Sequence, residues 1–235
     1  RAMTGYKNHF EGHGEFCASS SMEYTRDFAT PSGTNDQVWH VFDKIGHEQP
    51  WTGGDDYSGT GGTYQGIYIT GGISGDFVEL KLPYKINVKQ IELTGWNTAT
   101  TSRFPEKATV VGSNDGLTWE TVGSWTGASY TQNYERKMFI MSSSKYYSVY
   151  RLVITETVSS QYTTLGQVRY FGTREQGQSV LHDGQLTLTK NLNVPRIGPP
   201  LDADDTPRRD RLVVEYNTST NPTFEGAVRD TSGRG

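Results

Sequence analysis

The chain has 235 residues, a formal net charge of −4, 27 glycines, 14 tyrosines and 5 tryptophans. The negative charge argues against a surface that neutralises nucleic-acid phosphates, and no apolar run approaches the roughly 20 residues needed to cross a bilayer. We therefore expect neither a nucleic-acid partner nor membrane insertion. Glycine and aromatic residues favour β-strands joined by turns, and Cys17, the single cysteine, cannot form an internal disulfide.

The first third of the chain carries few strand signals. Residues 1–37 are polar and rich in turn residues, without a lasting period. Residues 51–75 are rich in glycine and include Tyr57 and Tyr64, which predicts long loops around one short strand at 66–70. Two interpretations stay open for this stretch: packing over one end of the fold, or a rim that binds a ligand.

Strand signals become clear from residue 76 onward. Phe77-Val-Glu-Leu-Lys-Leu alternates apolar and polar residues and predicts a strand that Pro83 should end. Short strands, turns such as Asn114-Asp-Gly, and the lack of an amphipathic helix predict an all-β, jelly-roll β-sandwich. The further expected strands are 88–93, 108–113, 118–125, 138–141, 147–154 and 166–172.

The character of the sequence changes after residue 172. Residues 185–194 alternate strictly and predict an isolated β ribbon. We expect it to pair with the same ribbon of another copy; the alternative is that it folds back onto the edge of its own sandwich. A proline-rich, charged linker follows, and a new strand signal begins at 212 and stops at a turn signal. The expected domains are an N-terminal extension (1–14), the sandwich (15–175), the ribbon and linker (176–211) and the start of a truncated domain (212–235).

Several motifs resemble one family. Ala18-Ser-Ser-Ser, Trp39-His-Val-Phe-Asp, Trp51 and above all Ala108-Thr-Val-Val-Gly-Ser-Asn-Asp-Gly-Leu-Thr-Trp resemble discoidin domains, the coagulation factor type C fold. The resemblance extends over residues 15–173. Galactose-binding-like, family 32 carbohydrate-binding modules share that fold, so the resemblance implies an eight-strand sandwich that binds glycans, lipid head groups or proteins through loops at one end. It also implies that Trp39, Trp51 and Trp119 belong to the core.

The tail carries a second resemblance. Residues 212–216 and 228–235 are similar to the opening of a laminin-G/concanavalin-like lectin domain. Such a series of domains is similar to the arrangement in structural proteins of large marine and algal viruses and of phage fibres, which is an analogy of fold alone. The resemblance implies an extracellular or virion-surface location, with a glycan or cell-surface ligand, other copies of the chain, or neighbouring structural proteins as partners.

Signatures of catalysis are missing from the sequence. It contains no Gly-x-Ser-x-Gly elbow, phosphate-binding loop or dinucleotide fingerprint. The paired carboxylates Asp55 and Asp56 lie in a glycine-rich loop without a rigid partner, which does not support glycosidase chemistry. We therefore expect a non-enzyme.

Glycan binding needs an exposed aromatic face with hydrogen-bonding side chains around it. Trp96 follows a predicted strand and opens a polar loop; it either stacks on a sugar or packs beneath that loop. The candidate ligand-binding residues are Trp96, Asn97, Arg103, Tyr57, Tyr64 and Tyr130.

Calcium is the one cofactor that the resemblance implies. Discoidin-like glycan modules often hold it near the start of the sandwich, through carbonyls, an Asp after the Trp-x-x-Phe stretch and a Glu in the last strand. Asp43 matches the Asp, Glu48 is a second candidate, and Gln167 stands in the position of the Glu. Because a hard cation prefers carboxylate oxygens, the neutral amide weakens such a site. The alternative is that Asp43 only caps a turn.

The favoured hypothesis is a non-enzymatic module, within a multidomain virion-surface (capsid or fibre) protein or an extracellular cell-adhesion protein, that binds a glycan or another surface ligand. Two alternatives stay open. The chain is a purely structural assembly domain of a capsid or filament, or it is the accessory binding module of a secreted glycosidase.

Overall fold

The computed structural model describes residues 2–11, 13–23, 36–45 and 49–175, and the backbone of two short strands at 180–182 and 185–187. Antiparallel strands dominate this part of the chain. Its helices are two 3-10 helices, η1 (Val38–Phe42) and η2 (Thr98–Arg103). Within these ranges, neither the length nor the hydropathy of any helix would suffice to span a membrane.

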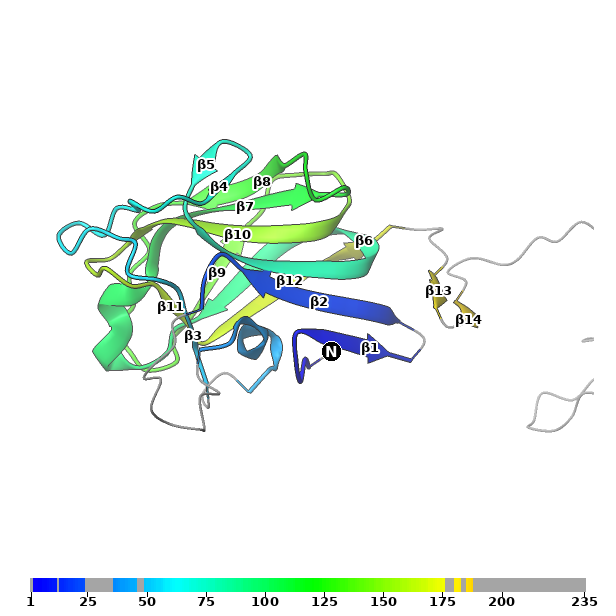
Figure 1. The fold of residues 1–235 in the computed structure, drawn as a ribbon, viewed down its shortest axis with the longest axis horizontal. Coiled ribbons are helices and arrows are strands. Elements are labelled where there is room, and N and C mark those ends of the chain that lie inside the picture. The colour runs from blue at the N-terminus through cyan, green and yellow to red at the C-terminus, as the bar shows by residue number, and fades with distance from the viewer. Residues whose placement is uncertain are drawn as a thin grey trace, which may run out of the picture. The chain divides into compact units, whose positions relative to one another are not determined.

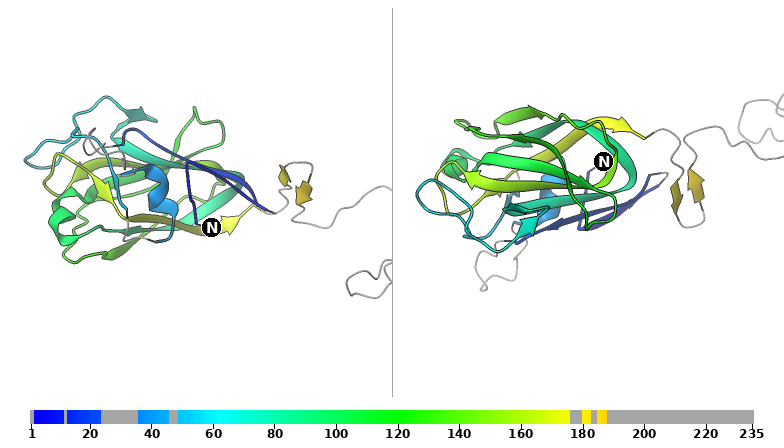
Figure 2. Two further views of the ribbon diagram at one scale, coloured as in Figure 1. Left: turned by 60° about the horizontal axis from the view of Figure 1, so that its bottom comes forward. Right: turned by 90° about the horizontal axis from the view of Figure 1, so that it is seen from above.

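The strands form the two layers of a β-sandwich (Figures 1 and 2). One layer contains, in spatial order, β1 (Lys7–Phe10), β2 (Gly14–Ser20), the first part of β6 (Asp76–Thr94), β10 (Tyr147–Thr157), β7 (Pro105–Ser113) and β8 (Glu120–Trp125). In the other layer, the second part of β6 lies between β12 (Gln167–Arg174) and β9 (Arg136–Ile140). Three short pairs complete the set: β3 (Trp51–Thr52) with β11 (Thr164–Leu165), β4 (Ile69–Thr70) with β5 (Ile73–Ser74), and β13 (Val180–His182) with β14 (Gln185–Thr187). The predicted all-β sandwich is confirmed.

Strand β6 belongs to both layers. Its residues 76–81 pair with β10, and its residues 86–94 pair with β12. Pro83 lies between these two ladders, where it has no partner in either. Its missing N–H therefore removes no ladder hydrogen bond. The prediction that Pro83 ends the strand is wrong, because the proline lies at the bend where β6 passes from one layer to the other.

The core lies between the layers. Val78 of β6 and Val110 of β7 flank Leu152 of β10 in direct register, and all three side chains are fully buried. Trp51 is also fully buried, and its indole N–H donates to the carbonyl of Met22 at 2.9 Å. The predicted core position of Trp51 is confirmed, while Trp39 is only partly buried against the core.

The N-terminal residues are part of the sandwich. Strand β1 pairs with β2 from Lys7 to Phe10, and the side chain of Met3 is only 3% exposed within the core. The backbone N–H of Met3 donates to the carbonyl of Phe42 at 3.0 Å. The sandwich therefore begins well before residue 15, where the sequence analysis placed its boundary.

Trp119 lies outside the core. It is partly exposed, and the guanidinium carbon of Arg151 lies 4.4 Å from its ring centroid and 3.9 Å from that of Phe77. Arg151 alternates with the core residue Leu152 along β10, so it faces away from the core. The predicted core position of Trp119 is wrong, because this tryptophan stacks on a cation on the outer side of the sheet.

The predicted ribbon has a partner in its own chain. Val180 pairs with Thr187, and His182 pairs with Gln185 two residues further along. Asp-Gly, the pair of residues between them, is one of the commonest hairpin connections, a signal that the sequence analysis overlooked. The expected lone ribbon is therefore wrong. The linker and the truncated domain, residues 188–235, lie outside the described residues.

Candidate functional site

Three loops meet at one end of the sandwich, which we call the loop end: residues 95–104, 126–135 and 157–163 (Figure 1). Backbone hydrogen bonds join them. The N–H of Gly95 donates to the carbonyl of Glu135 at 2.8 Å, and that of Ser159 donates to the carbonyl of Ser102 at 3.0 Å. The loop end is therefore a connected surface rather than a set of independent loops.

An aromatic pair lies at the loop end. The rings of Trp96 and Tyr134 meet edge to face, with centroids 5.7 Å apart and an angle of 83° between their planes. The backbone N–H of Tyr134 also donates to the carbonyl of Trp96 at 2.9 Å. Tyr134 is 41% exposed and Trp96 is partly exposed, so both rings present apolar surface to solvent. Trp96 is among the residues predicted from the sequence to bind a ligand, and Tyr134 is not.

The turn before Tyr134 is held by Glu135. Its carboxylate accepts hydrogen bonds from the backbone N–H groups of Thr131 (2.8 Å) and Gln132 (3.3 Å) and pairs with Lys137 at 2.9 Å. The hydrogen bond from Thr131 and the contact with Lys137 lower the pKa of Glu135 to about 2. Tyr134 has a φ of 54°, a left-handed conformation that non-glycine residues seldom adopt. The loop thus fixes its ring beside Trp96.

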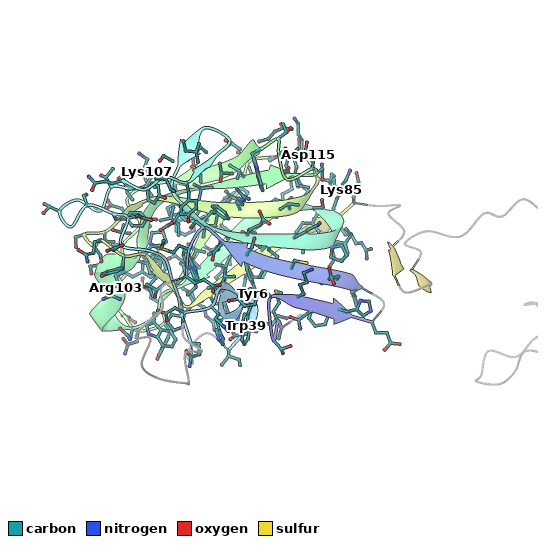
Figure 3. The ribbon with its side chains drawn as sticks, viewed as in Figure 1. Tyr6, Trp39, Lys85, Arg103, Lys107 and Asp115 are labelled. Carbon is teal, nitrogen blue, oxygen red and sulfur yellow. The ribbon has the colours of Figure 1, made fainter. Side chains whose placement is uncertain are left out.

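Two further sequence candidates lie at the same end. Asn97 follows Trp96 and is partly buried. Arg103 ends η2, and its guanidinium carbon lies 5.1 Å from the ring centroid of Tyr162 (Figure 3). The loop end therefore offers aromatic faces, an amide and a cation. These are the groups that a polar ring-shaped ligand such as a sugar requires.

The other three aromatic candidates are buried. Tyr57, Tyr64 and Tyr130 are 3%, 8% and 5% exposed. The Tyr57 hydroxyl donates to the carbonyl of Ile154 at 3.1 Å, and the Tyr130 ring stacks on Phe104. Burial raises the pKa of Tyr64 to about 12. All three rings cover the core, so Tyr130 does not present the exposed face that was expected. For Tyr57 and Tyr64 the burial matches packing over one end of the fold, the first of the two interpretations that the sequence left open.

The surroundings of Asp43 bear on the calcium prediction. Its carboxylate is buried and accepts from the backbone N–H of Ile45 (2.7 Å) and from the amide nitrogen of Gln167 (3.4 Å), while His40 Nδ1 lies 3.3 Å away. The Gln167 oxygen accepts from Arg169 at 2.6 Å, which orients the amide nitrogen toward Asp43. These groups present N–H donors where calcium requires oxygen ligands, so they do not fit the ion.

The hydrogen bond from the backbone N–H of Ile45 to the Asp43 carboxylate caps the turn, which is the alternative to a calcium site that the sequence left open. Glu48, the second proposed ligand, lies outside the described residues. Within the described ranges, no group of three His, Cys, Asp or Glu side chains could hold a metal ion. Calcium binding stays a prediction, which a metal titration or a comparison of melting temperatures in calcium and in EDTA tests.

Comparison with known proteins identifies similar folds and no close relative. No family model and no curated protein matches the chain. A fragment of a putative chitobiase from Bacteroides thetaiotaomicron matches with a TM-score of 0.51 and 11% identity, over 75% of this chain and 98% of that chain. The C-terminal domain of a Bacteroides fragilis chitobiase matches with a TM-score of 0.48 and 17% identity, over 72% and 99%. A family 32 carbohydrate-binding module from Clostridium perfringens, solved with galactose, matches with a TM-score of 0.45 and 14% identity, over 66% of this chain and 92% of that chain. At these identities the likeness establishes the β-sandwich fold alone.

Proposed function

We propose that this chain is a non-catalytic glycan-binding module that holds its ligand at the loop end. The observation that supports the proposal is the partly exposed pair of Trp96 and Tyr134, with Asn97 and Arg103 at the same end of the sandwich. A sugar presents C–H groups on one face and hydroxyls at its rim. Aromatic faces complement the first, and amide and guanidinium groups complement the second.

A glycan array with the full chain tests this proposal. We expect binding to a subset of the glycans on the array. Tyr134→Ala and Trp96→Ala should each weaken that binding roughly tenfold or more, a free-energy change of about 1.4 kcal/mol. Phe171→Ala is the matched control, because Phe171 is an aromatic residue of β12 with the same 41% exposure as Tyr134. Binding that survives both loop-end substitutions would refute the assignment of the site.

As part of the proposal, the module belongs to a virion-surface protein or an extracellular adhesin and contacts a cell-surface glycan. The support for this setting is the resemblance of the residue order to discoidin-like domains and of the tail to lectin-like domains. An accessory module of a secreted glycosidase is the alternative. The fold occurs in fragments of chitobiases, which makes that alternative concrete.

A structural assembly role is the second candidate, and one surface favours it. On the second layer, Ile140 and Phe171 flank Gln90 in direct register, and Met138 lies two residues along β9 on the same face. These apolar side chains are 69%, 41% and 51% exposed. A second copy of the chain would cover them. Sedimentation of the full chain and of Ile140→Glu distinguishes the two roles: a dimer that the substitution dissociates supports assembly, and a monomer in both cases excludes it.

A further inference from the structure

A cavity of about 700 Å³ opens along one edge of the sandwich, with Phe10 and Phe16 from β1 and β2 on one side and Val168 from β12 on the other. We call it the lateral cavity. Pockets for small molecules have volumes of about 300–1,000 Å³. Tyr84 and Ile86 also line the lateral cavity, and they flank Lys85, which Figure 3 shows at the end opposite Arg103. The lateral cavity is therefore separate from the loop end.

The walls of the lateral cavity are largely apolar. The rings of Phe10 and Phe16 meet edge to face with centroids 5.3 Å apart, and those of Phe16 and Tyr84 do so at 5.8 Å. Leu82 and Val168, which are only 7% and 2% exposed, add aliphatic surface. This lining favours a ligand with a hydrocarbon body, because apolar surface moved out of water is stabilised by the hydrophobic effect.

The charged groups that line the lateral cavity are of one sign. Lys44, Arg169 and Arg174 contribute to its lining, and no Asp or Glu is found among the described lining residues. Arg169 is already engaged, since it pairs with Glu92 at 3.4 Å and donates to Gln167 at 2.6 Å. These positive charges favour a ligand that carries a negative charge.

Arg174 has an unused hydrogen-bonding edge. Its guanidinium carbon lies 4.0 Å from the ring centroid of Tyr84, and it forms no ion pair within the described part of the chain. Its Nε and Nη2 atoms are buried without a hydrogen-bond partner among the described residues. These two nitrogens share one edge of the guanidinium, so no protein group among the described residues compensates this part of the cation.

A second buried donor lines the same cavity. The Tyr170 hydroxyl is buried, and it too lacks a hydrogen-bond partner among the described residues. Buried polar groups in native proteins are almost always paired, and an unpaired charged donor is particularly unfavourable. An oxyanion bound in the lateral cavity would compensate the positive charge of Arg174, which lines it.

We propose that the lateral cavity binds an amphipathic carboxylate of the fatty-acid type. The carboxylate pairs with the guanidinium of Arg174, and the hydrocarbon chain lies against Phe10, Phe16 and Leu82. This activity is independent of glycan binding, because it uses a different part of the molecule.

Calorimetric titration of the full chain with dodecanoate, kept below its critical micelle concentration, tests the ligand class. Dodecyltrimethylammonium supplies a tail of similar length with the opposite charge, and acetate supplies the head group alone. We expect saturable, one-to-one binding of dodecanoate and far weaker binding of the other two probes. Equal binding of both amphiphiles, or no binding of dodecanoate by the full chain, overturns the proposal.

Three variants test the site. Arg174→Gln should weaken dodecanoate binding roughly tenfold or more, as expected for the loss of charge-assisted hydrogen bonds. Arg136→Gln, which changes an exposed arginine of β9, is the matched control and should leave the affinity unchanged. Leu80→Trp should fill the lateral cavity and abolish binding while a cooperative thermal transition shows that the protein is folded. Unchanged affinity in Arg174→Gln would show that dodecanoate binds elsewhere.

Discussion

The amide nitrogen of Gln167 donates to Oδ1 of Asp43 at 3.4 Å, joining the last strand of the sandwich to the turn after η1 across 124 residues. A carboxylate at position 167 would instead face Asp43 as a like charge. Two adjacent carboxylates repel each other in the absence of a cation, and together they form a better calcium site.

We therefore predict that Gln167→Glu lowers the melting temperature in EDTA and that millimolar calcium restores it. The wild-type chain should melt at the same temperature in EDTA and in calcium, because Asp43 is already satisfied by N–H donors. Differential scanning calorimetry measures both effects. A clear loss of wild-type stability in EDTA would show that the chain holds structural calcium.

The tryptophans should differ in their contribution to stability. Trp51→Ala should lower the free energy of unfolding by about 3–5 kcal/mol, because the side chain is fully buried and leaves a large cavity. Trp96→Ala should lower it by only about 1 kcal/mol, since Trp96 is partly exposed. Urea unfolding followed by circular dichroism measures both values. The reverse order would mean that the loop end is part of the core.

The stack of Trp119 on Arg151 should be measurable as a coupling. A double-mutant cycle with Trp119→Leu and Arg151→Met should give an interaction energy of about 0.5–2 kcal/mol, typical of a partly desolvated cation–π contact. Combining Trp119→Leu with Arg136→Gln is the control, and those two effects should be additive because Arg136 lies in the other layer. A coupling near zero for the first pair would show that the stack does not stabilise the fold.

Asp76 should make stability fall as the pH rises. Burial raises the pKa of this carboxyl from 3.8 to about 6, despite the hydrogen bond from the Ser21 hydroxyl at 2.8 Å. The folded state therefore holds a proton that the unfolded state releases near pH 4. Between about pH 4 and pH 6 this group should remove about 2–3 kcal/mol of stability, with no further loss above pH 6.

Urea unfolding at pH 4, 5, 6 and 7.5 measures this effect. Asp76→Asn should lack the loss and be more stable than the wild type at pH 7.5. Comparing the two proteins isolates Asp76 from carboxyls such as Glu135, whose lowered pKa has the opposite effect at lower pH. Parallel pH profiles for the two proteins would contradict the prediction.

The sequence was sufficient to predict the main strands from residue 76 onward, but not β1 and β2, which lie in its polar N-terminal stretch. Phe77 to Lys81 shows an alternation of apolar and polar residues, and the largely apolar stretch around Leu152 pairs with it in the central ladder of the first layer. It was not sufficient at Pro83, because whether a proline ends a strand depends on whether its N–H would have had a partner. That partner is a property of the assembled sheet.

The candidate site was less predictable for the same kind of reason. Tyr57 and Tyr134 both occur in polar, glycine-containing segments, yet one is buried and the other is exposed. What separates them is tertiary: Tyr57 finds the carbonyl of Ile154, and Tyr134 is turned outward by a left-handed backbone. The polar loop between the strands at 118–125 and 138–141 was the available signal for Tyr134.

Because β6 is shared by the two layers, the order in which the chain leaves the ribosome limits when it can fold. Residues 76–81 need β10, whose pairing residues begin at Tyr147, and residues 86–94 need β12, which ends at Arg174. Synthesis must therefore pass residue 147, more than three fifths of the way along the 235 residues, before the central strand gains either of these neighbours. Until then the first part of β6 can pair with β2 on one edge only, while the edges that β10 and β12 later cover stay open. Nascent chains stalled before residue 174 should therefore be the form of this protein most prone to aggregate.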